Sequence, residues 1–74
     1  MAVNLAAFRL TTGRICEVDV AADLRNKLEG LGICVGRTIR LIKKGDPYIV
    51  GVYGTRIGLS PEIASQVHVT PLDT

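Results

Sequence analysis

The sequence predicts a mostly β domain in which five short strands form a small, strongly bent barrel with one or two short helices. Three observations favour this fold class. Five short segments are rich in apolar and β-branched residues, glycine and proline signals separate them every several residues, and two further segments carry helix signals. With 74 residues, the chain is expected to form a single domain over residues 1–74, with a thin core.

One helix is predicted just after the first strand, where three leucines recur at the spacing of one helical face. They are Leu24, Leu28 and Leu31. Asp23 is expected to cap the start of this helix, and either Gly30 or Gly32 to take the left-handed conformation that ends it. Because so short a helix is marginal in isolation, we expect the leucine stripe to lie on the sheet.

The first strand is predicted over residues 14–20, where apolar and acidic side chains alternate. On this pattern Cys16, Val18 and Val20 face the core, and Ile15 is the residue that breaks the alternation. Further strands are predicted over residues 38–44, 48–53, 55–59 and 67–70. In the second strand Ile39 and Leu41 are expected to face one way and Ile42 the other.

Three local signals place the connections and bends among the later strands. Gly45-Asp46-Pro47 is turn chemistry, and Gly51 in the third strand indicates a bulge or a sharp bend. Ser60-Pro61-Glu62 starts a second short helix, with a capping serine, a proline at the first helical position and an acid in the first turn.

Composition narrows the classes of function. The net charge is +2, which falls short of the clustered basic charge of a nucleic-acid module, and no apolar run approaches the ~20 residues that span a bilayer. Two cysteines and a start without a basic segment favour a cytoplasmic protein over a secreted one. The mean hydropathy of +0.31 indicates either a well-filled barrel interior or an exposed interaction face.

Neither catalysis nor a metal site is predicted. The one histidine, His68, is expected to point outward from its strand with no nucleophile beside it, and the carboxylates are spread singly along the chain. Cys16 and Cys34 are expected to be small buried hydrophobes, and with His68 they match no metal-ligand spacing. A transition-metal ion held by these three scattered residues stays an alternative.

A small barrel that binds nucleic acid is a further alternative, although we expect no nucleic-acid partner. Such barrels place aromatic side chains along a basic groove, and this chain has only Phe8, Tyr48 and Tyr53 as aromatics. Several basic residues fall near the second to fourth strands, which indicates a solvated sheet face. They are Arg37, Arg40, Lys43, Lys44 and Arg56.

The order of elements and glycines resembles the FeoA family, the small cytoplasmic proteins of ferrous-iron transport. Phe8 and Leu10 precede Gly13 as apolar residues do in that family. The segment Leu31-Gly32-Ile33-Cys34-Val35-Gly36 is similar to its Leu-Gly-apolar-x-x-Gly motif, and Gly45-Asp46-Pro47-Tyr48-Ile49-Val50 to its Gly-Asp-Pro-apolar strand entry. The resemblance covers nearly the whole chain, and Val35 replaces a proline that is often found before the second glycine.

This resemblance implies an SH3-like barrel without enzymatic activity that acts as an accessory or regulator. Its partner would be FeoB, a membrane iron(II) permease with a cytosolic GTP-binding domain, so that the protein meets the membrane only through this partner. The expected contact is an apolar and basic face formed by the helix and the loop after it. The candidate partner-binding residues are Arg25, Lys27, Leu28, Cys34 and Val35. The alternative is a metal-sensing domain similar to the C-terminal domain of metal-dependent repressors of the diphtheria-toxin-repressor type.

Overall fold

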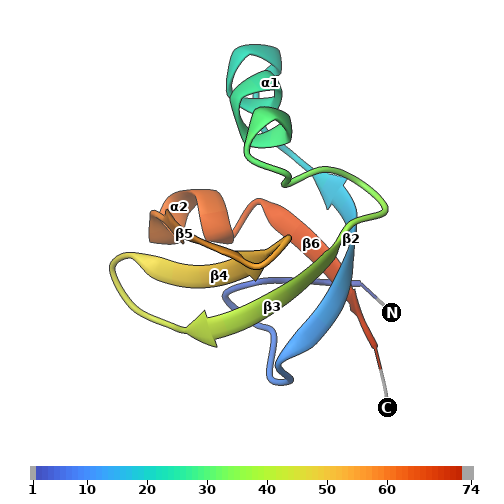
Figure 1. The fold of residues 1–74 in the computed structure, drawn as a ribbon, viewed down its shortest axis with the longest axis vertical. Coiled ribbons are helices and arrows are strands. Elements are labelled where there is room, and N and C mark those ends of the chain that lie inside the picture. Colours follow the sequence, from blue (N-terminus) through green and yellow to red (C-terminus); the bar gives the residue numbers. More distant parts are fainter. Residues whose placement is uncertain (1, 73–74) are drawn as a thin grey trace.

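The computed structural model describes residues 2–72, and Figure 1 shows how they are arranged. The strands are β1 (Val3–Asn4), β2 (Thr12–Val18), β3 (Thr38–Lys43), β4 (Tyr48–Val52), β5 (Thr55–Leu59) and β6 (Val67–Pro71). The helices are α1 (Ala22–Gly30) and α2 (Pro61–Ala64). The predicted mostly β class with two short helices is confirmed.

All strand pairs are antiparallel and form one sheet in the order β1-β6-β2-β3-β4-β5. The sheet has six strands and not five, because the short strand β1 pairs with β6 through Val3↔Val69 and Asn4↔His68. Figure 1 shows the sheet bending strongly, with α1 standing at one end of the molecule. The sheet carries α1 on the connection from β2 to β3, which also contains the loop of residues 31–37.

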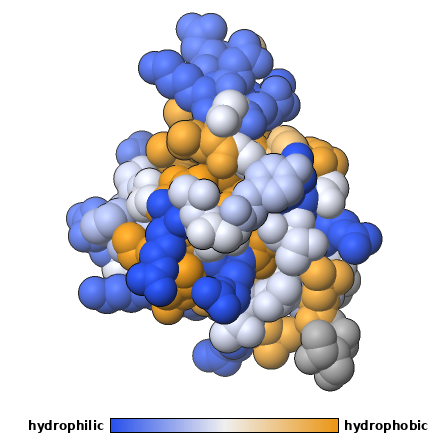
Figure 2. Space-filling model, in the orientation of Figure 1, coloured by the Kyte–Doolittle hydropathy of each residue, from blue (hydrophilic) through white to orange (hydrophobic). Residues whose placement is uncertain are grey.

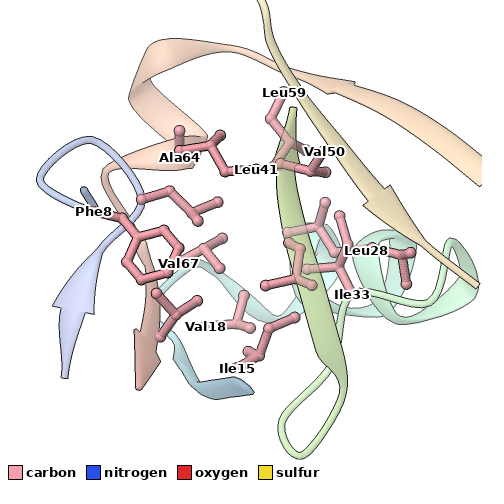
Figure 3. Packing of buried hydrophobic residues seen from close by; sticks show 14 residues of the cluster. Phe8, Ile15, Val18, Leu28, Ile33, Leu41, Val50, Leu59, Ala64 and Val67 are labelled. Atoms are coloured by element: carbon pink, nitrogen blue, oxygen red, sulfur yellow. The ribbon is translucent and has the colours of Figure 1, made fainter. Parts of the chain in front are cut away.

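The core contains apolar side chains from all of these elements except β1, together with two from the segment after β1 and Ile33 from the loop after α1. Figure 3 shows them converging between the strands and the two helices. The buried hydrophobic residues are Leu5, Phe8, Ile15, Val18, Leu28, Ile33, Ile39, Leu41, Val50, Val52, Leu59, Ala64, Val67 and Val69. The predicted facing of β3 is confirmed, since Ile39 and Leu41 are buried and Ile42 is exposed.

The predicted facing of β2 is confirmed at Val18, which is buried, but is wrong at Ile15 and Cys16 because the strand contains a bulge. Ile15 pairs with Val69 and Glu17 pairs with His68, so that Cys16 is an extra residue between them. The bulge shifts the alternation by one residue. Ile15 is therefore buried in the core, and Cys16 is exposed instead of facing inward.

Helix α1 also differs from its prediction at both ends. Ala21 and not Asp23 is the residue that precedes the first turn, and no side chain caps it. Leu31 lies just past the last turn and is 53% exposed, so it is not part of the buried stripe. Leu28 is the only buried residue of the helix, and Leu24 packs partly against the core.

The end of α1 is a Schellman motif, which confirms the expectation that a glycine stops the helix. Gly32 has a φ of 98°, its N–H donates to the carbonyl of Glu29 at 3.0 Å, and the N–H of Ile33 donates to the carbonyl of Leu28 at 2.9 Å. The buried side chains of Leu28 and Ile33 are thereby brought together, and Figure 3 shows them side by side. The turn thus fixes where the loop leaves the helix.

The bulge expected at Gly51 lies instead in the neighbouring strand. Leu41 pairs with Val50 and Lys43 with Ile49, so Ile42 of β3 is the extra residue. Gly51 is regularly paired on both sides. Its role is different: a Cβ atom added there would lie 3.4 Å from the Cδ1 atom of Ile42, over the outer face of the sheet. The predicted turn before β4 is confirmed.

Helix α2 begins as predicted, and this cap can be tested. The hydroxyl of Ser60 accepts a hydrogen bond from the N–H of Ile63 at 3.2 Å, with Pro61 in the first turn. Replacing Ser60 with alanine is expected to lower the free energy of unfolding by about 0.5–2 kcal/mol, because a helical N–H loses its acceptor. Urea denaturation measures this change. Ser65→Ala is the control, since the Ser65 hydroxyl donates to a carbonyl and caps no N–H; equal losses would contradict the assignment.

Candidate partner-binding site

A hollow of about 260 Å³ lies between α1, the bulged end of β2 and the loop after the helix. We call it the helix–loop hollow. Its charged lining residues are Glu17, Asp19, Arg25 and Glu29. Cys16, Cys34 and Val35 supply less polar parts of its lining.

Backbone hydrogen bonds fix the loop over β2. The N–H of Gly36 donates to the carbonyl of Ile15 at 2.7 Å, and the N–H of Ile15 donates to the carbonyl of Arg37 at 2.8 Å. The bulge turns Cys16 out of the core and into the hollow, where its thiol donates to the carbonyl of His68 at 3.4 Å. The hollow is therefore built by the same bulge that alters the facing of β2.

The structure brings three of the five candidate residues together. Arg25, Cys34 and Val35 line the helix–loop hollow, and the guanidinium of Arg25 donates to the carbonyl of Val20 at 3.0 Å. Lys27 is exposed on α1 outside the hollow lining. Leu28 is 3% exposed and lies beneath the helix, where it holds α1 on the core.

Two large apolar side chains of the loop region face solvent. Val35 is 64% exposed and Leu31 is 53% exposed. Figure 2 shows hydrophilic residues covering the tip formed by α1 and a band of hydrophobic surface between this tip and the sheet. Exposed apolar surface next to a hollow is typical of an interaction site.

The charge of the hollow differs from the basic face expected from the sequence. Three carboxylates and one guanidinium line it, so a cationic group suits it better than an anionic one. Sequence reasoning missed Cys16, Glu17, Asp19 and Glu29 as site residues, because only the bulge and the fold of the loop bring them next to Val35. In the sequence, the only sign of this acidic lining was the alternation of Glu17 and Asp19 with Val18.

The two cysteines line the same hollow, but they do not form a metal-ligand group with His68 in the part of the chain that the structure describes. Among residues 2–72, no group of three or more His, Cys, Asp and Glu side chains is placed to hold a metal ion. Cys16 is exposed and Cys34 is half-buried, so the expectation that both are buried is wrong. The thiol of Cys34 lies 3.8 Å from a guanidinium nitrogen of Arg37, which donates to it. Within the same residues, no helix has the length and apolar character needed to cross a membrane.

The bent antiparallel sheet, with α1 between β2 and β3 and α2 before β6, is that of a small SH3-like domain. Residues 9–71 match the FeoA domain. The chain therefore belongs to the FeoA family, which is associated with ferrous iron transport, and the resemblance read from the motifs is confirmed.

Solved structures agree with this assignment. The crystal structure of an iron uptake regulatory protein, FeoA, is 27% identical, with a TM-score of 0.86 over 97% of this chain and 99% of that one. The solution structure of a FeoA protein from Chlorobium tepidum is 20% identical, with a TM-score of 0.88 over 96% of this chain and 71% of that one. No curated protein sequence matches the chain significantly.

Two solved structures with bound metal ions share the fold over part of their length. ScaR with bound Cd²⁺ is 30% identical, with a TM-score of 0.84 over 93% of this chain but 35% of that one. A manganese-dependent transcriptional repressor in complex with manganese is 21% identical, with a TM-score of 0.84 over 96% of this chain and 37% of that one. The chain thus spans little more than a third of either protein.

Proposed function

We propose that this protein is an accessory and regulatory protein of bacterial ferrous iron transport. It acts in the cytoplasm and has no enzymatic activity of its own. It docks on the cytosolic side of a FeoB-type permease, at or near the GTP-binding domain. The family assignment supports the link to iron transport, and the exposed Val35 beside the helix–loop hollow is the observation that supports docking.

The hollow suits one kind of partner side chain. Its apolar edge at Val35 and its three carboxylates favour a group with an apolar stem and a cationic head, such as lysine or arginine. Desolvated apolar contact at the centre supplies most of the affinity of such an interface, and the surrounding charges set its orientation. On this proposal Val35 and Cys34 make the central contact.

The remaining candidate residues take supporting roles. Arg25 and Lys27 lie exposed on α1 and would contact the partner around the hollow. Leu28 is buried and acts by holding α1 in place. Since α1 stands at one end of the molecule, a partner can reach this face without contacting the rest of the sheet.

Replacing Val35 with aspartate is expected to weaken docking by at least about tenfold, since the complex must then bury a charge at its apolar centre. Isothermal titration of the protein into the isolated GTP-binding domain of the cognate permease, with and without nucleotide, measures this change. Val35 is 64% exposed, so its replacement leaves the fold intact. The control is Leu10→Asp, which places the same charge on another exposed apolar residue away from the hollow.

Two results would contradict different parts of the proposal: the location of the docking site, and docking itself. If Val35→Asp and Leu10→Asp weaken binding equally, the helix–loop hollow is not the docking site. If the unchanged protein binds neither the GTP-binding domain nor the full-length permease in detergent, docking itself fails.

Metal sensing is the second candidate, favoured by the 30% identity to ScaR with bound Cd²⁺. The residues available for it are Cys16, Cys34 and His68, which are not grouped as ligands among residues 2–72. Equilibrium dialysis against Cd²⁺ and Mn²⁺ tests this candidate. Stoichiometric binding that is lost in Cys34→Ser would favour metal sensing over docking.

A further inference from the structure

A second and larger hollow, of about 730 Å³, lies on the outer face of β3, β4 and β5. We call it the arginine groove. Its lining includes Arg37, Arg40, Arg56, Ile42, Gly51 and Tyr53. It shares no lining residue with the helix–loop hollow, and none of the described residues that line it is acidic.

The floor of the groove is a row of three residues across three strands. Gly51 pairs with Arg40 of β3 on one side and with Arg56 of β5 on the other. Neighbouring strands lie about 4.8 Å apart, so the backbones of the two arginines are about 10 Å apart. Gly51 has no side chain to fill the space between them, and a glycine at such a place in a strand allows another molecule close to the backbone.

A stacked pair lines another part of the groove. The guanidinium carbon of Arg37 lies 3.9 Å from the centroid of the Tyr53 ring, and Tyr53 is 73% exposed. The Nε atom of Arg37 is buried without a hydrogen-bond partner among residues 2–72. Together with the exposed Ile42, this pair gives the groove apolar surface between its positive charges.

We propose that the arginine groove binds an acidic segment of a partner protein. Carboxylates of the segment would pair with Arg40 and Arg56, because the planar guanidinium matches the carboxylate in two parallel hydrogen bonds. An apolar side chain of the same segment would rest on Ile42 and Tyr53. The charge complementarity of the groove identifies this occupant, and the proposal stands independently of docking at the helix–loop hollow.

A protein segment fits these observations better than single-stranded nucleic acid does. Nucleic-acid platforms stack successive bases on several aromatic side chains, whereas here Phe8 is buried, Tyr48 is half-buried and only Tyr53 is exposed. The net charge of +2 also provides little long-range attraction for a polyanion. Three arginines within one groove instead suit a few discrete carboxylates.

Fluorescence anisotropy with a labelled peptide of alternating glutamate and leucine tests the proposal. The double variant Arg40→Gln/Arg56→Gln is expected to weaken binding by at least about tenfold, because it removes both charged donors. Gly51→Val is expected to weaken binding comparably without changing the charge, since its side chain fills the groove, where the nearest atom is the flexible end of Ile42. The matched control is Arg9→Gln, which removes one positive charge outside the groove and should change the affinity by less than about twofold.

Saturable binding of the glutamate peptide, its absence with a glutamine–leucine peptide and its loss in the double variant would together support the proposal. Thermal unfolding of each variant confirms that the fold is retained, and the double variant decides the question if Gly51→Val does not fold. Absence of saturable binding, or an equal loss in Arg9→Gln, would overturn the proposal. Tighter binding of an oligothymidylate than of the peptide, lost in the same double variant, would overturn it in favour of nucleic acid.

Discussion

Replacing Leu28 with alanine is expected to lower the free energy of unfolding by about 2–5 kcal/mol, as truncation of a buried leucine does. Leu28 is 3% exposed and is the only buried residue of α1. Its side chain also meets Ile33 across the turn that ends the helix. The change therefore leaves a cavity under the helix and loosens the loop that lines the helix–loop hollow. Urea denaturation followed by circular dichroism measures the effect.

Leu31→Ala is the matched control for this variant. Leu31 lies three residues further along the chain and is 53% exposed, so its truncation should change the free energy of unfolding by less than about 0.5 kcal/mol. The same pair separates folding from docking, because only Leu28→Ala should affect both. Equal losses of stability in the two variants would mean that α1 is not seated on the core through Leu28.

Replacing Gly32 with valine is expected to destabilise the protein by about 2–5 kcal/mol, for two additive reasons. A side chain at a φ of 98° is strained by about 1–2 kcal/mol. A Cβ atom there would also lie 3.0 Å from the Cγ1 atom of Val52, and overpacking of this kind costs about 1–3 kcal/mol. Thermal and urea unfolding measure the sum.

Replacing Gly30 with alanine, two residues earlier in the chain, is expected to have the opposite effect on stability. Gly30 ends α1, and a Cβ atom added there meets nothing within 4 Å. Alanine at this position is expected to raise stability by up to about 1 kcal/mol, because it reduces the freedom of the unfolded chain and favours the helix. If both glycine variants shifted stability in the same direction, the turn at Gly32 would not be the feature that ends the helix.

Local chemistry made parts of the fold predictable. Ser60 and Pro61 specify the start of α2 through one hydrogen bond and one fixed dihedral angle, so no distant contact is needed to place it. The alternation in β3 is equally direct, since Ile39 and Leu41 are buried as predicted. The two-residue strand β1 is different, because it carries no pattern of its own and forms only against β6.

The candidate site was harder to predict, for a physical reason. A single extra residue in β2 reverses the facing of Ile15 and Cys16, and its presence depends on pairing with β6, which is far away in the sequence. The predicted helix pointed to Arg25, and the family motif pointed to Cys34 and Val35. Glu17 lies beside them in the hollow only because of the bulge in β2. The arginine groove depends in the same way on register, since Arg40 and Arg56 become neighbours of Gly51 only when three strands are aligned.

One side chain links the two surfaces. The guanidinium of Arg37 stacks on Tyr53 in the arginine groove and also donates to the thiol of Cys34, which lines the helix–loop hollow. A ligand that draws this guanidinium away from the Tyr53 ring also ends its contact with Cys34. The coupling free energy between two such sites is reciprocal. Each ligand therefore changes the affinity for the other ligand by the same factor. If both proposed ligands bind, Arg37 is the side chain through which binding at one surface would change the affinity at the other.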